Sequence, residues 1–339
     1  MRILVYRIGG IGDMIIALPA LWAIRKAFPD ADIVYLTDLK GKTERTVREL
    51  LPEEVYDDLI CYAKFSEIVK ILGKSFDAVF YLMNRNRDVL RIKRDKLFFR
   101  LVARKVYGIK HLEKVRLLDR KFKHVCSEYD YLLDCLYEEE ELKLPPRESL
   151  RPDLKLKESE RNRASKWIRE NTDGNLIAVM ASSAWSSKNW KEERFAEVVY
   201  RLIRKRDVFP LVFGGVKERE QADRLVNFWG RGRNLAGKFG LRMDAAIIER
   251  CKLYLGNDTG TMHLASAVGT RCVAIFSAID HPGRWDPFGQ GHKIIRKRVF
   301  CEICYQRACP REFHECMELV STEEVYRACI EVLDEVNQL

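Results

Sequence analysis

The sequence lacks any apolar run of the roughly 18 to 20 residues that a membrane-spanning helix needs. Its longest apolar stretch, residues 14–24, is interrupted by Pro19 and preceded by Asp13. The small residues of "ALPALWA" (17–23) resemble a signal-peptide cleavage site, yet the same stretch completes a strand, a glycine turn and a helix. We therefore expect a helix of a cytoplasmic protein rather than a leader.

Other absences narrow the class of protein. The chain has no internal repeat, and its 339 residues with 47% hydrophobic content suffice for two domains with buried cores. A dinucleotide oxidoreductase is disfavoured because Gly10 and Gly12 are followed by Ile15, where that fingerprint has a third glycine. A metal-dependent transferase is disfavoured because its paired carboxylates would be Asp30 and Asp32, in a solvated turn after a helix.

The order of apolar segments predicts parallel α/β architecture. Residues 3–8 form a short apolar run, residues 13–27 have apolar side chains at helical spacing, and residues 31–38 form a second apolar run. A strand, a helix and a strand in this order make the βαβ unit of a parallel sheet. The acidic, proline-containing stretch 137–160 predicts a domain boundary. The same alternation then restarts, with strands expected at 175–181, 210–215, 252–257 and 271–278 and a capped final helix at 321–336.

One segment makes the protein basic. The net charge is +10, and residues 85–124 alone contain 15 Lys and Arg against 4 Asp and Glu, so the remainder is close to neutral. The basic residues alternate with apolar ones, which is typical of amphipathic surface helices with solvated charges, or of a surface that binds a polyanion. No recognised nucleic-acid-binding motif accompanies the charge, so we expect no nucleic-acid partner.

The most informative stretch is "YLGNDTGTMHLASAVG" (254–269), in which a strand ends at Asn257 and a helix begins after Asp258. Backbone amides in the first turn of a helix lack helical partners and attract anions. The residues expected to hold a diphosphate there are Asp258, Thr259, Gly260, Thr261 and His263. The alternative is that Asp258 and Thr259 only cap the helix and that His263 is half-buried behind them.

Two further strand ends carry polar residues of the same kind. Ser182, Ser183 and Lys188 follow the strand at 175–181, and Lys188 offers an ammonium group to a diphosphate. Glu218 follows the strand at 210–215 after two glycines, where an acid can accept hydrogen bonds from a ribose. The alternative for Glu218 is an exposed helix start. Together these strand ends predict a nucleotide-diphosphate site in the second domain.

The ten cysteines divide into two groups. Six are scattered among apolar neighbours and are expected to fill cores: Cys61, Cys126, Cys135, Cys251, Cys272 and Cys329. The other four, Cys301, Cys304, Cys309 and Cys316, follow the spacing C-x2-C-x4-C-x6-C, and four thiolates this close can complete a structural zinc or iron site. His314 can replace one sulfur. The alternatives are free thiols in a packed loop and disulfides formed during preparation.

Three blocks occur in an order and spacing that resemble glycosyltransferase family 9, the ADP-heptose:lipopolysaccharide heptosyltransferases. They are "RIGGIGDMIIALPALWAIRKAFPDADI" (7–33), "SSKNWKEERFAEV" (186–198) and "GNDTGTMHLASAVGTRCVAIF" (256–276). The resemblance implies the α/β fold class called GT-B, two Rossmann-like domains whose parallel sheets face a cleft. We expect an acceptor-binding domain at 1–155, a nucleotide-sugar-binding domain at 156–320, and a final helix at 321–339 that returns to the first domain.

The resemblance also implies roles for individual residues. Asp13 matches the family's general base, which would take the proton of the acceptor hydroxyl while Gly9, Gly10 and Gly12 let the acceptor approach the backbone. Lys188 and the amides near Thr259 would stabilise the departing ADP, and direct displacement inverts the anomeric configuration. The scheme requires no catalytic cofactor.

The resulting prediction is an inverting transferase that moves a heptose from ADP-heptose to the inner core of lipopolysaccharide. Because the family's acceptor is a phosphorylated lipid, residues 85–124 are expected to bind the anionic inner face of the cytoplasmic membrane peripherally. The turn "GGIGD" lacks the serines common in the family, and "PGRWDPFGQG" (282–291) matches only loosely. A related nucleotide-sugar transferase with another sugar or a protein acceptor is therefore the alternative. A carrier that binds the nucleotide without turnover and an RNA-binding protein are two further classes.

Overall fold

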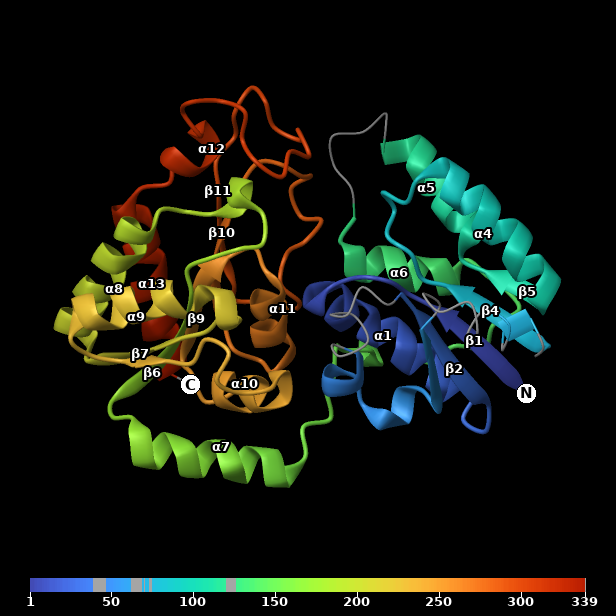
Figure 1. The fold of residues 1–339 in the computed structure, drawn as a ribbon, viewed down its shortest axis with the longest axis horizontal. Coiled ribbons are helices and arrows are strands. Elements are labelled where there is room, and N and C mark those ends of the chain that lie inside the picture. The colour runs from blue at the N-terminus through green and yellow to red at the C-terminus, as the bar shows by residue number, and fades with distance from the viewer. Residues whose placement is uncertain (39–46, 62–68, 70, 73–74, 120–125, 339) are drawn as a thin grey trace. The chain divides into compact units, whose positions relative to one another are not determined.

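The computed structural model describes residues 1–38, 47–61, 69, 71–72, 75–119 and 126–338. It divides into two compact units, Met1–Lys155 and Leu156–Leu339 (Figure 1). Each unit contains one sheet whose paired strands are all parallel, as the alternation of apolar segments predicts.

The first unit is built on a five-stranded sheet in the order β3-β2-β1-β4-β5. The chain winds from the central strand β1 to one side and then returns to the other side, so β1 and β4 are neighbours at a topological switch point. The strands are β1 (Arg2–Tyr6), β2 (Asp32–Thr37), β3 (Asp58–Cys61), β4 (Phe76–Tyr81) and β5 (Ala103–Tyr107). The helices are α1 (Ile11–Ala27), α4 (Val89–Val102), α5 (Ile109–Asp119) and α6 (Glu128–Tyr137), with 3-10 turns η1 (Glu53–Val55) and η2 (Arg147–Ser149).

The second unit repeats this winding with six strands in the order β11-β10-β9-β6-β7-β8, so its switch point lies between β6 and β9. The strands are β6 (Asn175–Met180), β7 (Val208–Val212), β8 (Arg233–Asn234), β9 (Leu253–Asn257), β10 (Cys272–Phe276) and β11 (Lys293–Arg296). The helices are α7 (Glu158–Asn171), α8 (Glu192–Arg206), α9 (Arg219–Trp229), α10 (Leu241–Ile248), α11 (Gly260–Ala267), α12 (Glu315–Glu318) and α13 (Thr322–Asn337), with 3-10 turns η3 (Ser186–Lys188) and η4 (Val216–Glu218).

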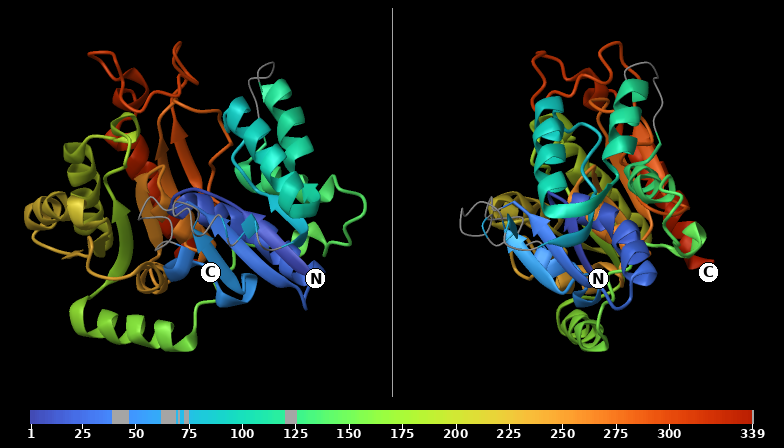
Figure 2. Two further views of the ribbon diagram at one scale, coloured as in Figure 1. Left: turned by 45° about the vertical axis from the view of Figure 1, so that its right-hand side comes forward. Right: turned by 90° about the vertical axis from the view of Figure 1, so that its right-hand side faces the viewer.

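The final helix packs within the second unit. The apolar stripe of α13, formed by Val325, Cys329, Val332 and Leu333, is buried in the core of the second unit. Its partners there are α8 and the strands β9, β10 and β11 (Figure 2). The apolar stripe of α13 therefore packs within the second unit, and the expectation that residues 321–339 return to the first domain stays a prediction.

The scattered cysteines behave as expected with one exception. Five of them are buried, and burial raises the pKa of Cys135, Cys251, Cys272 and Cys329 far above that of a free thiol. Cys126 is exposed and does not fill a core. It precedes Ser127, the N-cap residue of α6.

Candidate active site

The first polar cluster surrounds Asp13 in the first turn of α1. Its Oδ2 accepts a hydrogen bond of 2.9 Å from the amide of Gly10, and its Oδ1 accepts one of 2.8 Å from the amide group of Asn84. The guanidinium of Arg7 lies 3.2 Å from the same Oδ1. The carboxylate is thus held by three donors while 23% of the side chain stays exposed. A carboxylate fixed in this way can accept a proton from a ligand without first reorienting.

The glycine turn has a specific steric cause. A Cβ atom on Gly9 would lie 2.2 Å from the Cβ of Asp13, whereas one on Gly10 would lie 3.9 Å from the nearest atom, Asp13 Oδ2. Gly9 is therefore required because the side chain of Asp13 folds back over the turn. The sequence predicts that Gly9 makes room for an acceptor. In the structure, the side chain of Asp13 occupies the space beside Gly9.

Arg7 and Asn84 were not singled out by the sequence. Arg7 is fully buried and also donates to the carbonyl oxygens of Leu82 and Asp13, at 2.8 and 3.1 Å. Asn84 follows β4, the neighbour of β1, so the two donors come from the two strands of the switch point. A charged residue after the apolar run 3–6 was a usable signal for Arg7, but nothing in the sequence links Asn84 to Asp13.

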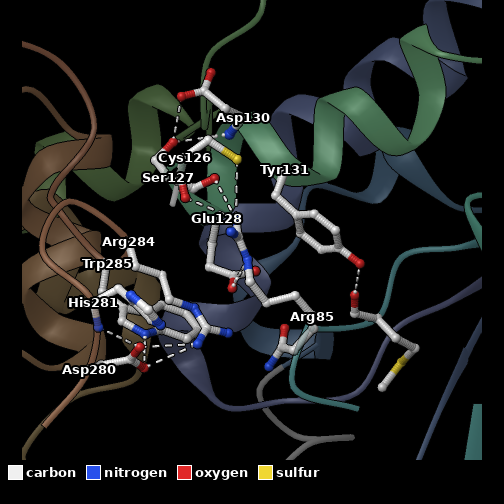
Figure 3. A network of polar contacts seen from close by, with 12 residues as sticks. Arg85, Cys126, Ser127, Glu128, Asp130, Tyr131, Asp280, His281, Arg284 and Trp285 are labelled. Carbon is white, nitrogen blue, oxygen red and sulfur yellow. Dashed lines mark hydrogen bonds and ion pairs between the residues drawn. The ribbon is translucent and has the colours of Figure 1, made fainter. Parts of the chain in front are cut away.

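The next residue, Arg85, fixes this segment to α6 (Figure 3). Arg85 Nε donates to Glu128 Oε1 at 3.0 Å, and both side chains are almost completely buried. Its guanidinium carbon lies 4.7 Å from the ring centroid of Tyr131, whose hydroxyl donates to the carbonyl of Met83 at 2.9 Å. Since Met83 and Arg85 are both anchored, the position of Asn84 between them is defined from both sides.

The second polar cluster lies at the switch point of the second unit. Lys188, in η3 after β6, places its Nζ 2.5 Å from Asp258 Oδ2, directly after β9. The two side chains are only 18% and 9% exposed. Two predicted donor-site residues 70 positions apart are thus brought into contact by neighbouring parallel strands.

The start of α11 lacks the side-chain cap that the simpler interpretation of these residues expects. Thr259 is the N-cap residue, but its side chain makes no capping hydrogen bond and its Oγ1 lies 3.2 Å from the hydroxyl of Tyr254. Asp258 pairs with Lys188 instead of capping the helix. The backbone amides of Gly260 and Thr261 lie in the first turn of α11, where amide groups have no hydrogen-bond acceptor within the helix. His263 is 3% exposed and is therefore more deeply buried than the half-buried position that the alternative interpretation expects.

Glu218 repeats the geometry of Asp13. Its Oε2 accepts a hydrogen bond of 2.7 Å from the amide of Gly215, and a Cβ on Gly214 would lie 2.8 Å from the Cβ of Glu218. The carboxylate of Glu218 is thus folded onto the turn after β7, and its hydrogen bonds to a ribose stay a prediction. Of the two predicted serines, Ser183 accepts a hydrogen bond of 3.2 Å from the amide of Trp185, and Ser182 is half-buried after β6.

The loop after β10 contributes residues that the sequence did not assign. Asp280 accepts hydrogen bonds from the buried Arg284 at 3.1 Å and from Trp285 Nε1 at 2.8 Å (Figure 3). Burial raises the pKa of the neighbouring Asp286, and the charge of Asp258 raises it further. Asp286 therefore lies within electrostatic range of Asp258, the partner of Lys188.

The four clustered cysteines line one cavity but do not form a complete metal-binding group. The four cysteines and His314 line one small enclosed cavity of about 20 Å³. Within the part of the chain that the structure describes, no three His, Cys, Asp or Glu side chains stand as a formed metal-binding group. The structural metal stays a prediction.

Two doubly wound parallel units, each with polar side chains at its switch point, define the GT-B class of glycosyltransferases. The model of "Glycosyltransferase family 9 (heptosyltransferase)" matches residues 103–314, more than half of the sequence. The chain belongs to this family and is a glycosyltransferase.

Relatives and solved structures agree with this assignment. Lipooligosaccharide heptosyltransferase 2 of Campylobacter jejuni is 24% identical over 96% of both chains. Among solved structures, a glycosyl transferase of family 9 from Veillonella parvula is similar with a TM-score of 0.73, at 20% identity and over 98% of this chain and 97% of that one. The ADP-heptose lipopolysaccharide heptosyltransferase II of Escherichia coli has a TM-score of 0.72, at 18% identity and over 99% and 100% of the two chains. At these identities the structures establish the fold.

Proposed function

We propose that this protein is an inverting heptosyltransferase that moves a heptose from ADP-heptose to the inner core of lipopolysaccharide. The observation that carries the proposal is the Asp13 carboxylate, held by Gly10, Arg7 and Asn84 yet still partly exposed. The near full-length similarity to a lipooligosaccharide heptosyltransferase supports the choice of sugar and acceptor. A related transferase that uses another sugar or a protein acceptor is the alternative.

The reaction is a single displacement. The acceptor hydroxyl attacks the anomeric carbon of the donor sugar and Asp13 takes its proton, while the bond between that carbon and the diphosphate oxygen breaks. The new bond forms on the face opposite to the departing ADP, so the configuration inverts. Asp13 supplies the base and the second unit supplies the charge for the leaving group, and so the transfer needs no metal ion.

The second unit is the donor site in this scheme. Lys188 and the first-turn amides at Thr259, Gly260 and Thr261 stabilise the charge that develops on ADP. Asp258 acts on Lys188, whose ammonium it holds at 2.5 Å. Glu218 accepts from the ribose, Ser182 and Ser183 donate to the phosphates, and His263 supports the start of α11 from within the packing.

The acceptor is presented on a membrane, and α4 is suited to contact that surface. Leu90, Leu97 and Leu101 are 75%, 66% and 75% exposed, and their spacings of seven and four residues place them on one side of the helix. The basic residues of the same helix are Arg91, Lys93, Arg94, Lys96 and Arg100. Exposed leucines flanked by cations are typical of a helix lying in an anionic membrane interface.

We therefore include peripheral association with the inner face of the cytoplasmic membrane in the proposed function. Near such a surface each basic residue contributes about 1 kcal/mol, and the contribution falls with salt. No described helix is both long and apolar enough to cross a bilayer. Residues 120–125 of the predicted basic segment lie outside the described part of the chain.

The test of the proposed function is transfer with an Asp13→Asn variant. With ADP-heptose and a lipid A-linked inner-core acceptor, we expect the wild type to release ADP and the variant to turn over about 100- to 10,000-fold more slowly, the usual contribution of a general base. ADP binding by the variant should be unchanged. If the wild type transfers no sugar from any ADP-sugar, or if the variant is fully active, the proposal fails.

A further inference from the structure

The loop after β11 has a backbone conformation that depends on hydrogen bonds to the segment after β10. It carries Cys301, Cys304 and Cys309, and two of its non-glycine residues, Ile303 and Tyr305, have positive φ angles of 64° and 54°. Such conformations cost free energy and persist only where the surroundings enforce them. Here the amides of Ile303 and Tyr305 donate to the carbonyls of Ala278 and Ile279, at 2.7 and 2.8 Å.

This loop conformation places four cysteines at the wall of one cavity. Cys301, Cys304, Cys309 and Cys316 all line the same enclosed cavity of about 20 Å³, and all four are free. Cys316 is buried, and Cys301, Cys304 and Cys309 are partly buried. Arg311 lines the cavity as well and brings a positive charge to this group.

The same loop holds the turn that carries Lys188. Ser187, which is 1% exposed, donates through its amide to the carbonyl of Arg307 at 3.2 Å and through its hydroxyl to the carbonyl of Gln306 at 2.6 Å. The ring of His314 hydrogen-bonds to the backbone of Ser187. Ser187, the residue before Lys188, is thus held by three residues that lie between the second and fourth cysteines.

We propose that Cys301, Cys304, Cys309 and Cys316 together bind one divalent metal ion of the zinc or ferrous type, and that the ion fixes the loop that positions Lys188. Four thiolates make a closed tetrahedral set, which is the arrangement of structural zinc sites. Binding releases the four thiol protons and leaves a site of net charge −2, which the guanidinium of Arg311 partly balances. The ion draws the thiols into the cavity that they already surround. Lys188 is then a residue that touches the donor, and the cysteines are positioning residues.

The first experiment measures the metal itself. The full chain, purified under reducing conditions without chelator from medium supplemented with zinc and iron, is expected to carry close to one equivalent of one of these metals by elemental analysis. The metal-free protein titrated with Co²⁺ should develop the absorption bands of tetrahedral cobalt thiolate. Cys304→Ser and Cys309→Ser should lower both signals. Cys126→Ser, which removes an exposed cysteine outside the cluster, should leave them unchanged. Metal-free protein without a cobalt spectrum, or disulfides among the four cysteines in reduced protein, would overturn the metal site.

The second experiment tests the link to Lys188, which rests on the proposed function. Removing the metal should lower kcat/KM for the donor by up to about 100-fold, the loss expected when a positioning group moves by about 1 Å. The KM for the acceptor should stay the same, and circular dichroism should report an intact fold. A protein that loses its metal yet keeps its donor kcat/KM refutes the positioning role alone. A protein that holds metal but transfers no sugar refutes the proposed function and leaves the metal site standing.

Discussion

The ammonium of Lys188 and the carboxylate of Asp258 form an ion pair of 2.5 Å at the carboxyl ends of two neighbouring strands. Since both side chains are mostly buried, the pair presents one oriented cation beside the amides of the α11 start. A diphosphate that binds there meets a charge whose position is already fixed. That arrangement lowers the cost of ordering the site when the ligand arrives.

Replacing this cation should weaken nucleotide binding. We expect Lys188→Ala to lower ADP affinity by about 10- to 100-fold, because hydrogen bonds to charged groups contribute about 1.5–3 kcal/mol. The melting temperature should also fall, because Asp258 loses its partner. Calorimetric titration with ADP well below the melting temperature measures the effect. The matched control is Lys191→Ala, which removes an exposed lysine paired with Glu318 at 2.6 Å and should leave ADP affinity unchanged. Equal affinity in Lys188→Ala and wild type would refute the assignment.

The glycine turn offers a test on two adjacent residues. Gly9→Ala should displace the side chain of Asp13, whose Cβ would lie 2.2 Å from the new methyl group. Gly10→Ala meets nothing closer than 3.9 Å and should be tolerated. We expect Gly9→Ala to reduce the transfer rate by about 100-fold, the scale of a misplaced catalytic group, with ADP binding intact. A Gly9→Ala variant as active as Gly10→Ala would contradict the role of Asp13.

Asp286 predicts a pH-dependent stability. Its pKa is raised by burial and by the charge of Asp258, so the folded protein holds this proton more tightly than the unfolded chain does. The ionised group therefore destabilises the fold at neutral pH, and this unfavourable contribution disappears as the pH falls below the ordinary pKa of an aspartate. Asp286→Asn should raise the melting temperature at pH 7 and leave it almost unchanged near pH 3. A variant that is less stable than wild type at pH 7 would show that Asp286 is needed as a charge.

The exposed leucines of α4 predict reversible membrane binding. The wild type should co-sediment with vesicles that contain anionic lipid and should dissociate as the salt concentration rises. Changing Leu90, Leu97 and Leu101 to serine together should reduce binding at low salt, because the apolar contribution is lost. Leu319→Ser, which changes a half-exposed leucine of the second unit, is the control. Binding that is equally strong in high salt, or unaffected by the triple change, would refute this part of the proposed function.

The sequence predicted the α/β class and most strand ends because buried parallel strands are short apolar runs, which are easily recognised in a sequence. It did not predict that β8 and β11 extend the second sheet, since these strands are short or half-exposed. It named Lys188 and Asp258 because strand ends of parallel sheets gather at one edge, and it named Asp13 because the glycine turn and the aspartate resemble those of glycosyltransferase family 9. It missed Asn84 and Arg85, whose partners Asp13 and Glu128 lie 71 and 43 residues away, because such pairs depend on strand order rather than on local spacing.

The burial of α13 in the second unit has a practical consequence for the gene. A premature stop codon just before Thr322 would remove a stripe that packs against β9, β10 and β11, and β9 is the strand that leads into Asp258. We expect such a product to be degraded in the cell rather than to persist as a shortened enzyme. Affinity tags and reporter fusions should therefore be joined by a linker beyond the last turn of this helix.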